Sequence, residues 1–289
     1  MNETAINWTE LTWNPMSGCT KISPECAHCY AYSLAEQRRG TNAFPNGFDL
    51  TIRPHKLAEP AKLKAPSLIF TNSMSDPGLD EVPDAYLADI LDAMERSPQH
   101  RYQVLTKRPE ELAAKLRRLG RRMPASVWMG VTIGVQRAAW RLDALRDIPG
   151  AVLRFVSAEP ILEPLTLDLT GISWLITGGE SGNHASQPKV LDRRFLVRRG
   201  DRAKGEPLWV PRPERMEWIR ALRDQCAAAG VAHWFKQWGG PRPTSGGRTL
   251  DGRTHDGLPL HVPGAMPDGY EHASRSRQHE APRVQLPLL

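Results

Sequence analysis

Short apolar runs alternate along the chain with longer stretches in which apolar residues recur every three or four positions. The runs are rich in β-branched and aliphatic residues and are bounded by polar residues, glycine or proline, a pattern typical of buried strands. We therefore predict strands at residues 6–13, 67–71, 102–105, 127–132, 152–156, 174–177 and 233–235.

Helical periodicity fills most of the intervals between these runs. Helices are predicted at residues 83–96, 110–119, 136–147 and 214–229. Strands that alternate with helices predict a parallel sheet with helical crossovers. About seven such units suit an α/β fold of the parallel (β/α) barrel type, a complete or partial TIM-type barrel. The alternative is an open doubly wound sheet.

Composition is consistent with one such domain. The chain has 289 residues, of which 40% are hydrophobic and 24% charged, and these values exclude a wholly disordered protein. We predict a single domain at residues 1–258, with a basic inserted loop at 183–213 and a hairpin at 249–258, where Asp251-Gly252 is a turn signal. Residues 259–289 are predicted to form an irregular, mobile tail.

Neither a membrane span nor a signal peptide is expected. The sequence holds no run of 18 apolar residues, and its first ten residues lack a basic segment followed by an apolar one. The sequence therefore predicts a cytoplasmic protein without a membrane partner.

Polar and charged residues follow five of the predicted strands. The segments are Asn72-Ser73-Met74-Ser75-Asp76, Thr106-Lys107-Arg108-Pro109, Ser157-Ala158-Glu159-Pro160, Gly178-Gly179-Glu180-Ser181-Gly182 and Lys236-Gln237-Trp238-Gly239-Gly240. In parallel α/β folds ligands bind at the carboxyl ends of strands, so these segments are expected to share one site. Any one of them could instead be ordinary turn and capping chemistry.

Three of the four cysteines lie close together. Cys19, Cys26 and Cys29 fall within eleven residues after the first predicted strand, whereas Cys226 stands alone in a helical apolar pattern and is expected to be a core residue. Three thiolates on one loop can hold an iron–sulfur cluster with one open corner, or a zinc ion with a fourth ligand from elsewhere. His28 is an awkward fourth ligand because it directly precedes Cys29. A cluster, zinc and no metal at all remain open on this spacing.

These segments, in this order, resemble a known family. The stretches from Trp13-Asn14-Pro15-Met16-Ser17-Gly18-Cys19 to Cys29-Tyr30-Ala31, the five strand-end segments and Leu250-Asp251-Gly252-Arg253-Thr254 are similar to a phage-associated family of largely uncharacterised, radical-SAM-like proteins with a three-cysteine motif. The similarity covers roughly residues 5 to 258.

The resemblance implies a cofactor set and roles for the site residues. Cys19, Cys26 and Cys29 would bind a 4Fe-4S cluster that carries S-adenosyl-L-methionine (SAM) at its open corner, for reductive cleavage and hydrogen abstraction from an unknown substrate. Cofactor binding is expected from Asn72, Ser73, Ser75, Asp76, Lys107 and Glu159. Catalytic roles are expected for Glu180 and Lys236. For each charged residue the alternative is a salt bridge at the barrel mouth. The family also implies an electron donor and, for some members, a three-Cys-motif partner protein.

The distribution of positive charge along the chain favours an anionic substrate. The net charge is +6, yet residues 96–146 alone hold twelve Lys and Arg against three acids, and a second basic stretch runs from Arg193 to Arg202. Some of these cations end helices, where they complement the helix dipole and need no ligand. The rest are compatible with a nucleic acid or nucleotide substrate, for which tryptophan side chains could provide stacking surfaces.

Three functions are therefore compared. The first is a radical-SAM-type enzyme. The second is a zinc-stabilised nucleic-acid-binding protein without catalysis, and the third is an electron-transfer protein that holds a cluster but does not cleave SAM. Metal content and SAM cleavage distinguish them.

Overall fold

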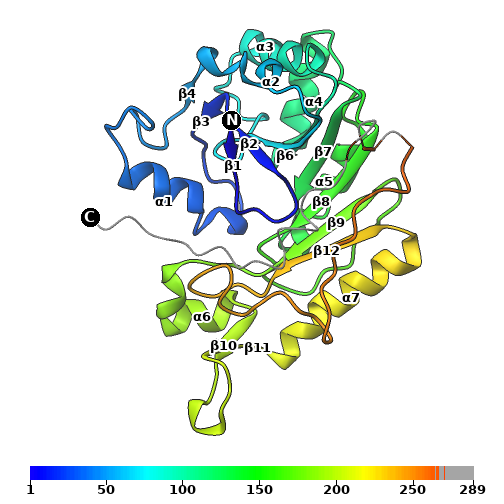
Figure 1. Cartoon of the computed structure of the whole chain (residues 1–289). Helices are drawn as coiled ribbons and strands as arrows, with labels where there is room; N and C mark the ends of the chain where they lie inside the picture. Colours follow the sequence, from blue (N-terminus) through cyan, green and yellow to red (C-terminus); the bar gives the residue numbers. More distant parts are fainter. Residues whose placement is uncertain (264, 267–269, 271–289) are drawn as a thin grey trace.

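Seven parallel strands form the centre of the molecule in their order along the chain. In this computed structural model, which describes residues 1–263, 265–266 and 270, they are β2 (Leu11–Trp13), β5 (Leu68–Thr71), β6 (Arg101–Thr106), β7 (Val127–Thr132), β8 (Leu153–Ala158), β9 (Trp174–Gly178) and β12 (Ala232–Gln237) (Figure 1). The short strand β1 (Asn2–Glu3) joins β2 antiparallel and completes an eight-stranded sheet. A doubly wound sheet would reverse the strand order part-way, so this alternative is wrong.

The sheet has the strand order of a barrel but is open along one side. Among the described residues no strand pairing joins β12 to β1 or β2. Side chains bridge this gap instead, because the Asn7 amide donates to the Lys236 carbonyl at 3.3 Å and accepts from the Trp234 indole at 3.2 Å. The partial form of the predicted barrel is therefore the one observed.

Helices cover the outer face of the sheet. They are α3 (Asp84–Glu95), α4 (Pro109–Arg118), α5 (Arg141–Arg146) and α7 (Pro213–Ala229). The apolar stripe of α3 is buried, and α4 begins with proline and two glutamates and ends with basic residues, as the helix dipole favours. The predicted helix at 136–147 is shorter than expected because the 3-10 helix η3 (Gln136–Ala138) occupies its first turn.

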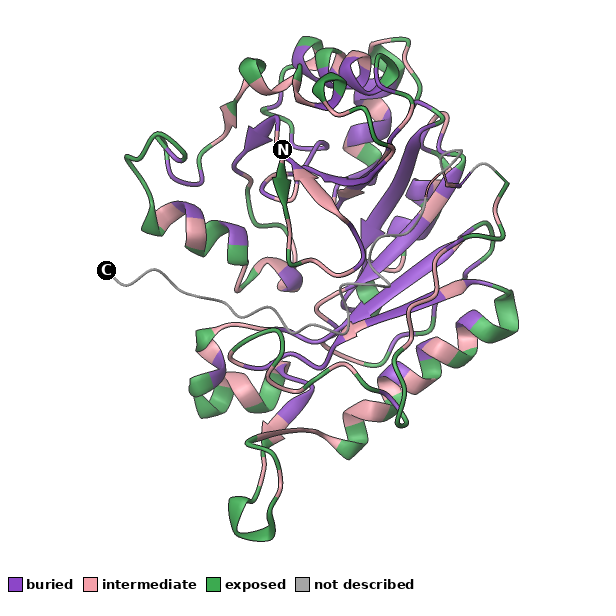
Figure 2. Cartoon of the chain, viewed as in Figure 1, coloured by how far each residue is buried: buried purple, intermediate pink, exposed green. Residues whose placement is uncertain are grey.

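Aromatic side chains fill the inner face of the sheet. Trp174 lies among Trp8, Trp128, Phe155 and Trp234, with ring centroids 5.6–6.4 Å away. A Cβ on Gly130 would come within 2.4 Å of the Phe155 ring, so this packing requires glycine there. Figure 2 shows the central strands β7 and β9 buried along their whole length, whereas the edge strand β1 is exposed. The barrel is thus a packed core beneath the carboxyl ends of its strands.

Two long connections carry the remaining elements. Between β2 and β5 lie β3 (Met16–Ser17), η1 (Pro24–Cys26), α1 (Tyr30–Gln37), β4 (Thr51–Ile52), η2 (Pro54–Lys56) and α2 (Glu59–Lys62). Between β9 and α7 lie η4 (Asn183–Ser186), α6 (Pro188–Arg194), β10 (Val197–Arg199), η5 (Arg202–Lys204) and β11 (Trp209–Pro211). The chain passes from β8 to β9 without a helix.

Several local predictions are corrected. The first strand spans only Leu11–Trp13, because residues 6–10 bridge the open side of the barrel. The basic stretch at 183–213 is not a simple loop but holds α6 and an antiparallel hairpin of β10 and β11. At 249–258 only the turn is present, with positive φ at Asp251 and Gly252 and single bridges at Leu250 and Asp256.

Most of the predicted tail at 259–289 lies outside the described residues. In the described part, Ala265 is buried and its carbonyl accepts from Trp128 and Arg101. No helix of the described part is both long and apolar enough to cross a bilayer.

Candidate active site

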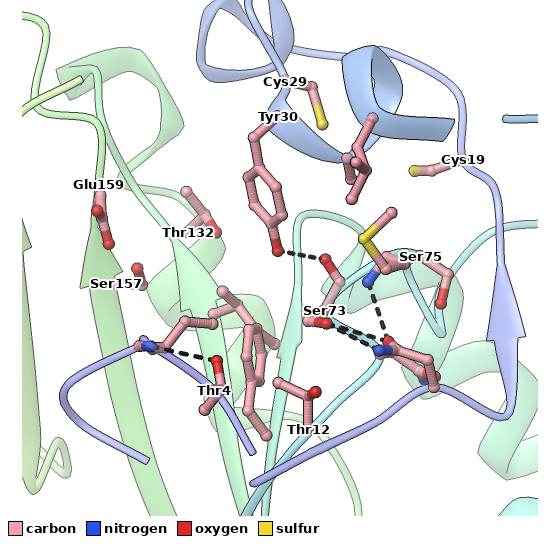
Figure 3. A pocket seen from close by; sticks show the side chains of 18 of the residues that line it. Thr4, Thr12, Cys19, Cys29, Tyr30, Ser73, Ser75, Thr132, Ser157 and Glu159 are labelled. Atoms are coloured by element: carbon pink, nitrogen blue, oxygen red, sulfur yellow. Dashed lines mark hydrogen bonds between the residues drawn. The ribbon is translucent and has the colours of Figure 1, made fainter. Parts of the chain in front are cut away.

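One cavity of about 940 Å³ lies at the carboxyl ends of the parallel strands. All eleven residues predicted for the site line it, namely Cys19, Cys26, Cys29, Asn72, Ser73, Ser75, Asp76, Lys107, Glu159, Glu180 and Lys236. Figure 3 shows several of them around the cavity, with the cysteines on one side and Glu159 on the other. Parallel topology brings these distant segments together, as the sequence indicated.

The three cysteines lie on a loop that leaves β3 and enters α1. Gly18 begins this loop with φ of +100°, and a Cβ there would come within 2.5 Å of the Asp49 backbone. All three thiols are free and half-buried. Their sulfur atoms are not all within 4.8 Å of one another among the described residues. Cys226 is buried on α7, as predicted, in the outer core, which is the apolar layer between the sheet and the helices that cover it. Burial raises its pKa to about 12.

Glu25 fixes this loop to the barrel. Its fully buried carboxylate accepts from the Gly134 amide at 2.9 Å and lies 3.4 Å from the Arg141 guanidinium. Burial opposes ionisation, but hydrogen bonds from Ser23 and Gly134 and the charge of Arg141 outweigh it and lower the Glu25 pKa. The ion pair thus holds the middle of the cysteine loop against the end of β7.

Arg108 touches the first cysteine directly. Its buried guanidinium donates to Cys19 Sγ at 3.4 Å, to Asp76 at 3.3 Å and to Thr20 at 2.7 and 2.8 Å. Burial and the charge of Asp76 raise the pKa of Cys19 to about 11, although Arg108 opposes the shift. Burial also acts on Cys26, but the charge of Lys107 and backbone hydrogen bonds overcome it and lower the pKa of Cys26.

The carboxylate of Asp76 is already engaged within the protein. It accepts from the Gly78 and Lys107 amides and from the Thr106 hydroxyl, in addition to Arg108. Its predicted cofactor contact stays a prediction, and its geometry is that of a residue that positions Arg108 and the turn after β6.

Asn14 organises the segment after β5. Its amide exchanges hydrogen bonds with the Ser73 hydroxyl at 3.0 and 3.1 Å and accepts from the Met74 amide. The Tyr30 hydroxyl, directed across the cavity from beside Cys29, donates to the Ser73 carbonyl at 2.6 Å (Figure 3). The Ser75 hydroxyl donates to the Met16 carbonyl. Asn14 and Tyr30 belong to the segments that resemble the three-cysteine family. Their hydrogen bonds to the Ser73 segment were not predicted, because they depend on the path of the loop.

Six cavity-lining residues each have a buried polar atom without a hydrogen-bond partner in the described structure, namely Trp8, Glu25, Arg53, Asn72, Thr132 and Arg248. Two of these atoms are the side-chain oxygens of neutral residues at strand ends, Oδ1 of Asn72 and Oγ1 of Thr132. Asn72 also has a positive φ of 63°, which is costly for a non-glycine residue. Buried polar atoms are almost always paired, so these two mark a place where a ligand would supply donors.

Glu159 and Lys236 form an ion pair at the end of the barrel that carries the cavity. Lys236 Nζ donates to Glu159 Oε1 at 2.7 Å, and both side chains are largely buried. They follow β8 and belong to β12, two strands that do not pair directly because β9 lies between them.

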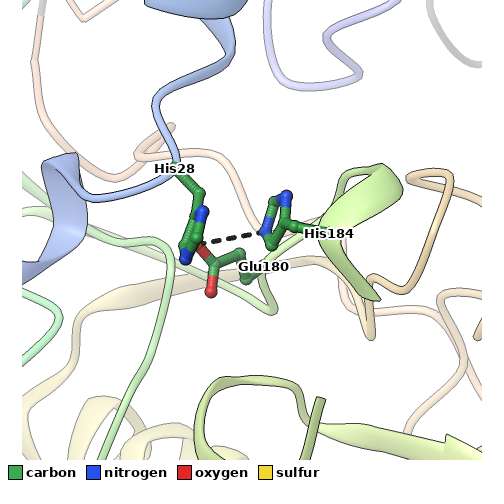
Figure 4. Close-up of side chains that lie close together, drawn as sticks. All are labelled: His28, Glu180 and His184. Atoms are coloured by element: carbon green, nitrogen blue, oxygen red, sulfur yellow. Dashed lines mark ion pairs between the residues drawn. The ribbon is translucent and has the colours of Figure 1, made fainter. Parts of the chain in front are cut away.

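Glu180 is bound by a residue of α6. The Arg194 guanidinium donates to both Glu180 oxygens, at 2.6 and 3.0 Å, and also to the Pro24 carbonyl in the cysteine loop. Figure 4 shows His28 and His184 beside the same carboxylate. Burial lowers the pKa of both histidines.

These two histidines do not make a good metal site. Glu180, His28 and His184 place one ligand atom each within 4.8 Å of one another. The two rings, however, are stacked with centroids 4.0 Å apart and planes within 9°. A metal ion is bound in the plane of an imidazole at about 2 Å, so one ion cannot serve two parallel rings at this spacing. The stack instead ties the cysteine loop to η4.

Comparison with known proteins places the chain in a family. A family model described as "Protein of unknown function (DUF5131)" matches residues 3–193 and 203–259. The chain belongs to the DUF5131 family. The match to DUF5131 spans all eleven predicted site residues, and it is interrupted at residues 194–202, which include Arg194 at the end of α6 and the strand β10.

Other comparisons add little to the DUF5131 assignment. No curated protein matches the chain. Among solved structures it is similar to a point mutant of spore photoproduct lyase, with 14% identity, a TM-score of 0.41, and coverage of 76% of this chain and 74% of that one.

Proposed function

We propose that the protein is a radical-SAM-type iron–sulfur enzyme. The observation that carries the proposal is that three free thiols on one loop open into a single cavity at the carboxyl ends of sequentially ordered parallel strands. The fourth cysteine lies in the outer core. Three thiolates can hold a 4Fe-4S cluster and leave one iron for a cofactor.

Among the described residues, the three thiols do not form a ready-made site for a single zinc ion. With zinc–sulfur bonds of about 2.3 Å, a tetrahedral site brings its thiolates within about 4 Å of one another. The three sulfur atoms are not gathered within 4.8 Å. A cluster binds each thiolate at a different iron, so it suits a wider spread.

The chain's own residues fit a charged cofactor. When bound, the cluster and SAM supply reductive cleavage of the sulfonium and removal of a hydrogen atom from the substrate. Arg108 and Lys107 stabilise the thiolate forms of Cys19 and Cys26 by charge. The unpaired oxygens of Asn72 and Thr132 would accept from cofactor amino or hydroxyl groups, which would end the cost of leaving them buried without partners.

Lys236, Glu159 and Glu180 have separate roles in this proposal. The Lys236 ammonium, held by Glu159, can bind a carboxylate or phosphate of a ligand, and Glu159 keeps it in place until then. Glu180 shapes the wall beside the cysteine loop through Arg194, and its catalytic role stays a prediction.

Anaerobic reconstitution with iron and sulfide tests the proposal. We expect brown protein with roughly four irons per chain, and 5′-deoxyadenosine from SAM once dithionite is added. Cys26→Ala should lose the cluster. Cys226→Ala is the matched control, because it removes a thiol from the outer core and should retain full iron content.

Other outcomes would overturn the proposal. Colourless protein with one tightly held zinc after the same treatment would identify a zinc-stabilised protein. A stable cluster without any SAM cleavage would identify an electron-transfer protein. Loss of iron in Cys226→Ala would contradict the proposal that only three cysteines bind the cluster and that one iron is left for the cofactor.

The remaining predictions from the family resemblance belong to this proposal. Reductive cleavage needs an electron donor, which the cell must supply. Association with phages and with a three-Cys-motif partner protein is likewise proposed, and co-purification from the native host would test the partner.

A further inference from the structure

A basic arm projects from the rim of the cavity. The arm comprises α6 and the hairpin of β10 and β11, residues 188–212, and its tip extends away from the body of the molecule (Figure 1). The tip is exposed, as Figure 2 shows. Arg194, where α6 ends, donates to Pro24 in the cysteine loop and to Glu180 on the cavity wall. The arm is therefore attached beside the three cysteines.

The arm holds an excess of positive charge. Residues 188–212 contain eight Lys and Arg against three acids. The acids offset only some of the cations, since Arg198 pairs with Glu206, Lys204 with Asp201 and Arg212 with Asp192. In the described structure, Lys189, Arg193, Arg199 and Arg202 are exposed and have no ion pair. Cations without an ion-pair partner on a projecting element attract a polyanion.

Planar and apolar side chains accompany these cations. Arg199 lies over the Trp209 ring at 5.8 Å, and Leu208 beside it is exposed. Tyr30 and Tyr32 are exposed by 57% and 43% around the cysteine loop, with Lys21 over the Tyr32 ring at 4.6 Å. Aromatic faces next to Lys and Arg are the means by which proteins hold unpaired bases and their phosphates together.

The cavity leaves room for part of such a ligand. Its volume of about 940 Å³ is at the upper end of the range for small-molecule sites, roughly 300–1,000 Å³. A cofactor beside the cysteines would leave space for a nucleoside-sized group near Lys236. A folded acidic protein could also contact the arm, so competition by poly-glutamate is included in the test below.

We propose that the basic arm binds the phosphate backbone of a single-stranded nucleic acid and directs one of its nucleotides into the cavity. The proposal rests on the proposed function for what happens in the cavity, but binding by the arm does not require a cluster. Its cations would then contact phosphates, and Tyr30 and Tyr32 would stack on bases at the entrance.

Binding of a fluorescein-labelled 20-nucleotide single strand, as DNA and as RNA, tests this proposal by fluorescence anisotropy. The test variant is R193Q/R199Q/R202Q. The control, R96Q/R117Q/R122Q, removes three exposed arginines of the helix ends away from the cavity and changes the net charge equally. We expect the arm variant to bind roughly tenfold more weakly at about 0.1 M salt, with a salt dependence reduced by about two in the slope of log K against log salt. The control should bind as the native protein does.

Several outcomes would overturn the proposal. They are equal binding by the arm variant and the native protein, an equal loss in the control, and displacement of the strand by poly-glutamate at the same charge concentration. Iron content measured on the same reconstituted samples separates this failure from that of the proposed function. A sample with a full cluster and no strand binding refutes only the proposal that the arm binds nucleic acid. Strand binding by a sample that forms no cluster refutes only the proposal of a radical-SAM-type enzyme.

Discussion

His233 is a buried histidine that the fold keeps neutral. It lies on β12, with Nε2 2.9 Å from the Thr177 hydroxyl. Burial, followed by the charges of His255 and Arg223, lowers its pKa from 6.5 to about 3. The unfolded chain therefore takes up a proton below pH 6.5 that the folded chain does not, so this stability is complete above pH 6.5 and is lost as the pH falls.

We expect the free energy of unfolding to fall by about 2 kcal/mol between pH 7 and pH 5 through this residue. Urea unfolding at pH 7, 6 and 5 measures it. His233→Gln should reduce the pH dependence by that amount, whereas the exposed His55→Gln should leave it unchanged. An unaltered slope in His233→Gln would show that another group is responsible.

Arg108 is a buried residue that the fold keeps charged next to a cysteine. Its contact with Cys19 leads us to expect that Arg108→Gln makes the reduction potential of the reconstituted cluster more negative. The reduced cluster carries more negative charge than the oxidised cluster. A hydrogen bond and a positive charge beside a ligating sulfur therefore stabilise the reduced form and raise the reduction potential. A redox titration followed by electron paramagnetic resonance checks this. Arg118→Gln, at an exposed ion pair with Asp84, is the control, and equal potentials in both variants would contradict the prediction.

For single residues, the sequence predicted which side chains line the cavity better than it predicted their hydrogen-bond and ion-pair partners. Every predicted site residue lines the cavity, because the carboxyl ends of parallel strands share one edge. The engagement of Glu180 by Arg194 and the anchoring role of Glu25 were missed. These contacts depend on the paths of irregular loops, which have no periodicity to read.

Among the elements, the cysteine loop is held to the barrel in part by the buried ion pair of Glu25 and Arg141. Glu25→Gln would leave the Arg141 charge without its partner, so we expect the free energy of unfolding to fall by about 3 kcal/mol. The same variant should retain less iron after reconstitution, because the loop loses its charge attraction to Arg141 of the barrel. Denaturant unfolding and iron content measure the two effects. Glu217→Gln, at an exposed pair with Arg220, should change neither, and full stability of Glu25→Gln would refute the anchoring role.

Regular elements were predictable where they are long enough to show a burial pattern. The inner strands β5, β7 and β9 are buried on both faces and the longer helices on one, so their patterns were readable. The strands β10 and β11 have only three residues each and pair with each other away from the sheet, which leaves no alternation long enough to detect.

In the whole molecule, the open side of the barrel is bridged by Asn7. Asn7→Ala removes both hydrogen bonds between the N-terminal loop and β12, and we expect a loss of about 1–3 kcal/mol in the free energy of unfolding. Hydrogen exchange should become faster in β12. The exposed Asn183→Ala is the control. Unchanged exchange in β12 would mean that the Asn7 hydrogen bonds do not stabilise this open side of the barrel.

Residues 159–173, which join β8 to β9 without a helix, have a consequence for how the protein is made. Leu165 and Leu167 of this connection pack in the outer core and are held by Gln225 of α7, about sixty residues further along. During synthesis the ribosome must therefore release α7 before this part of the core can be covered. Until then we expect Leu165 and Leu167 to be exposed on the nascent chain, where chaperones that recognise apolar surface would bind them.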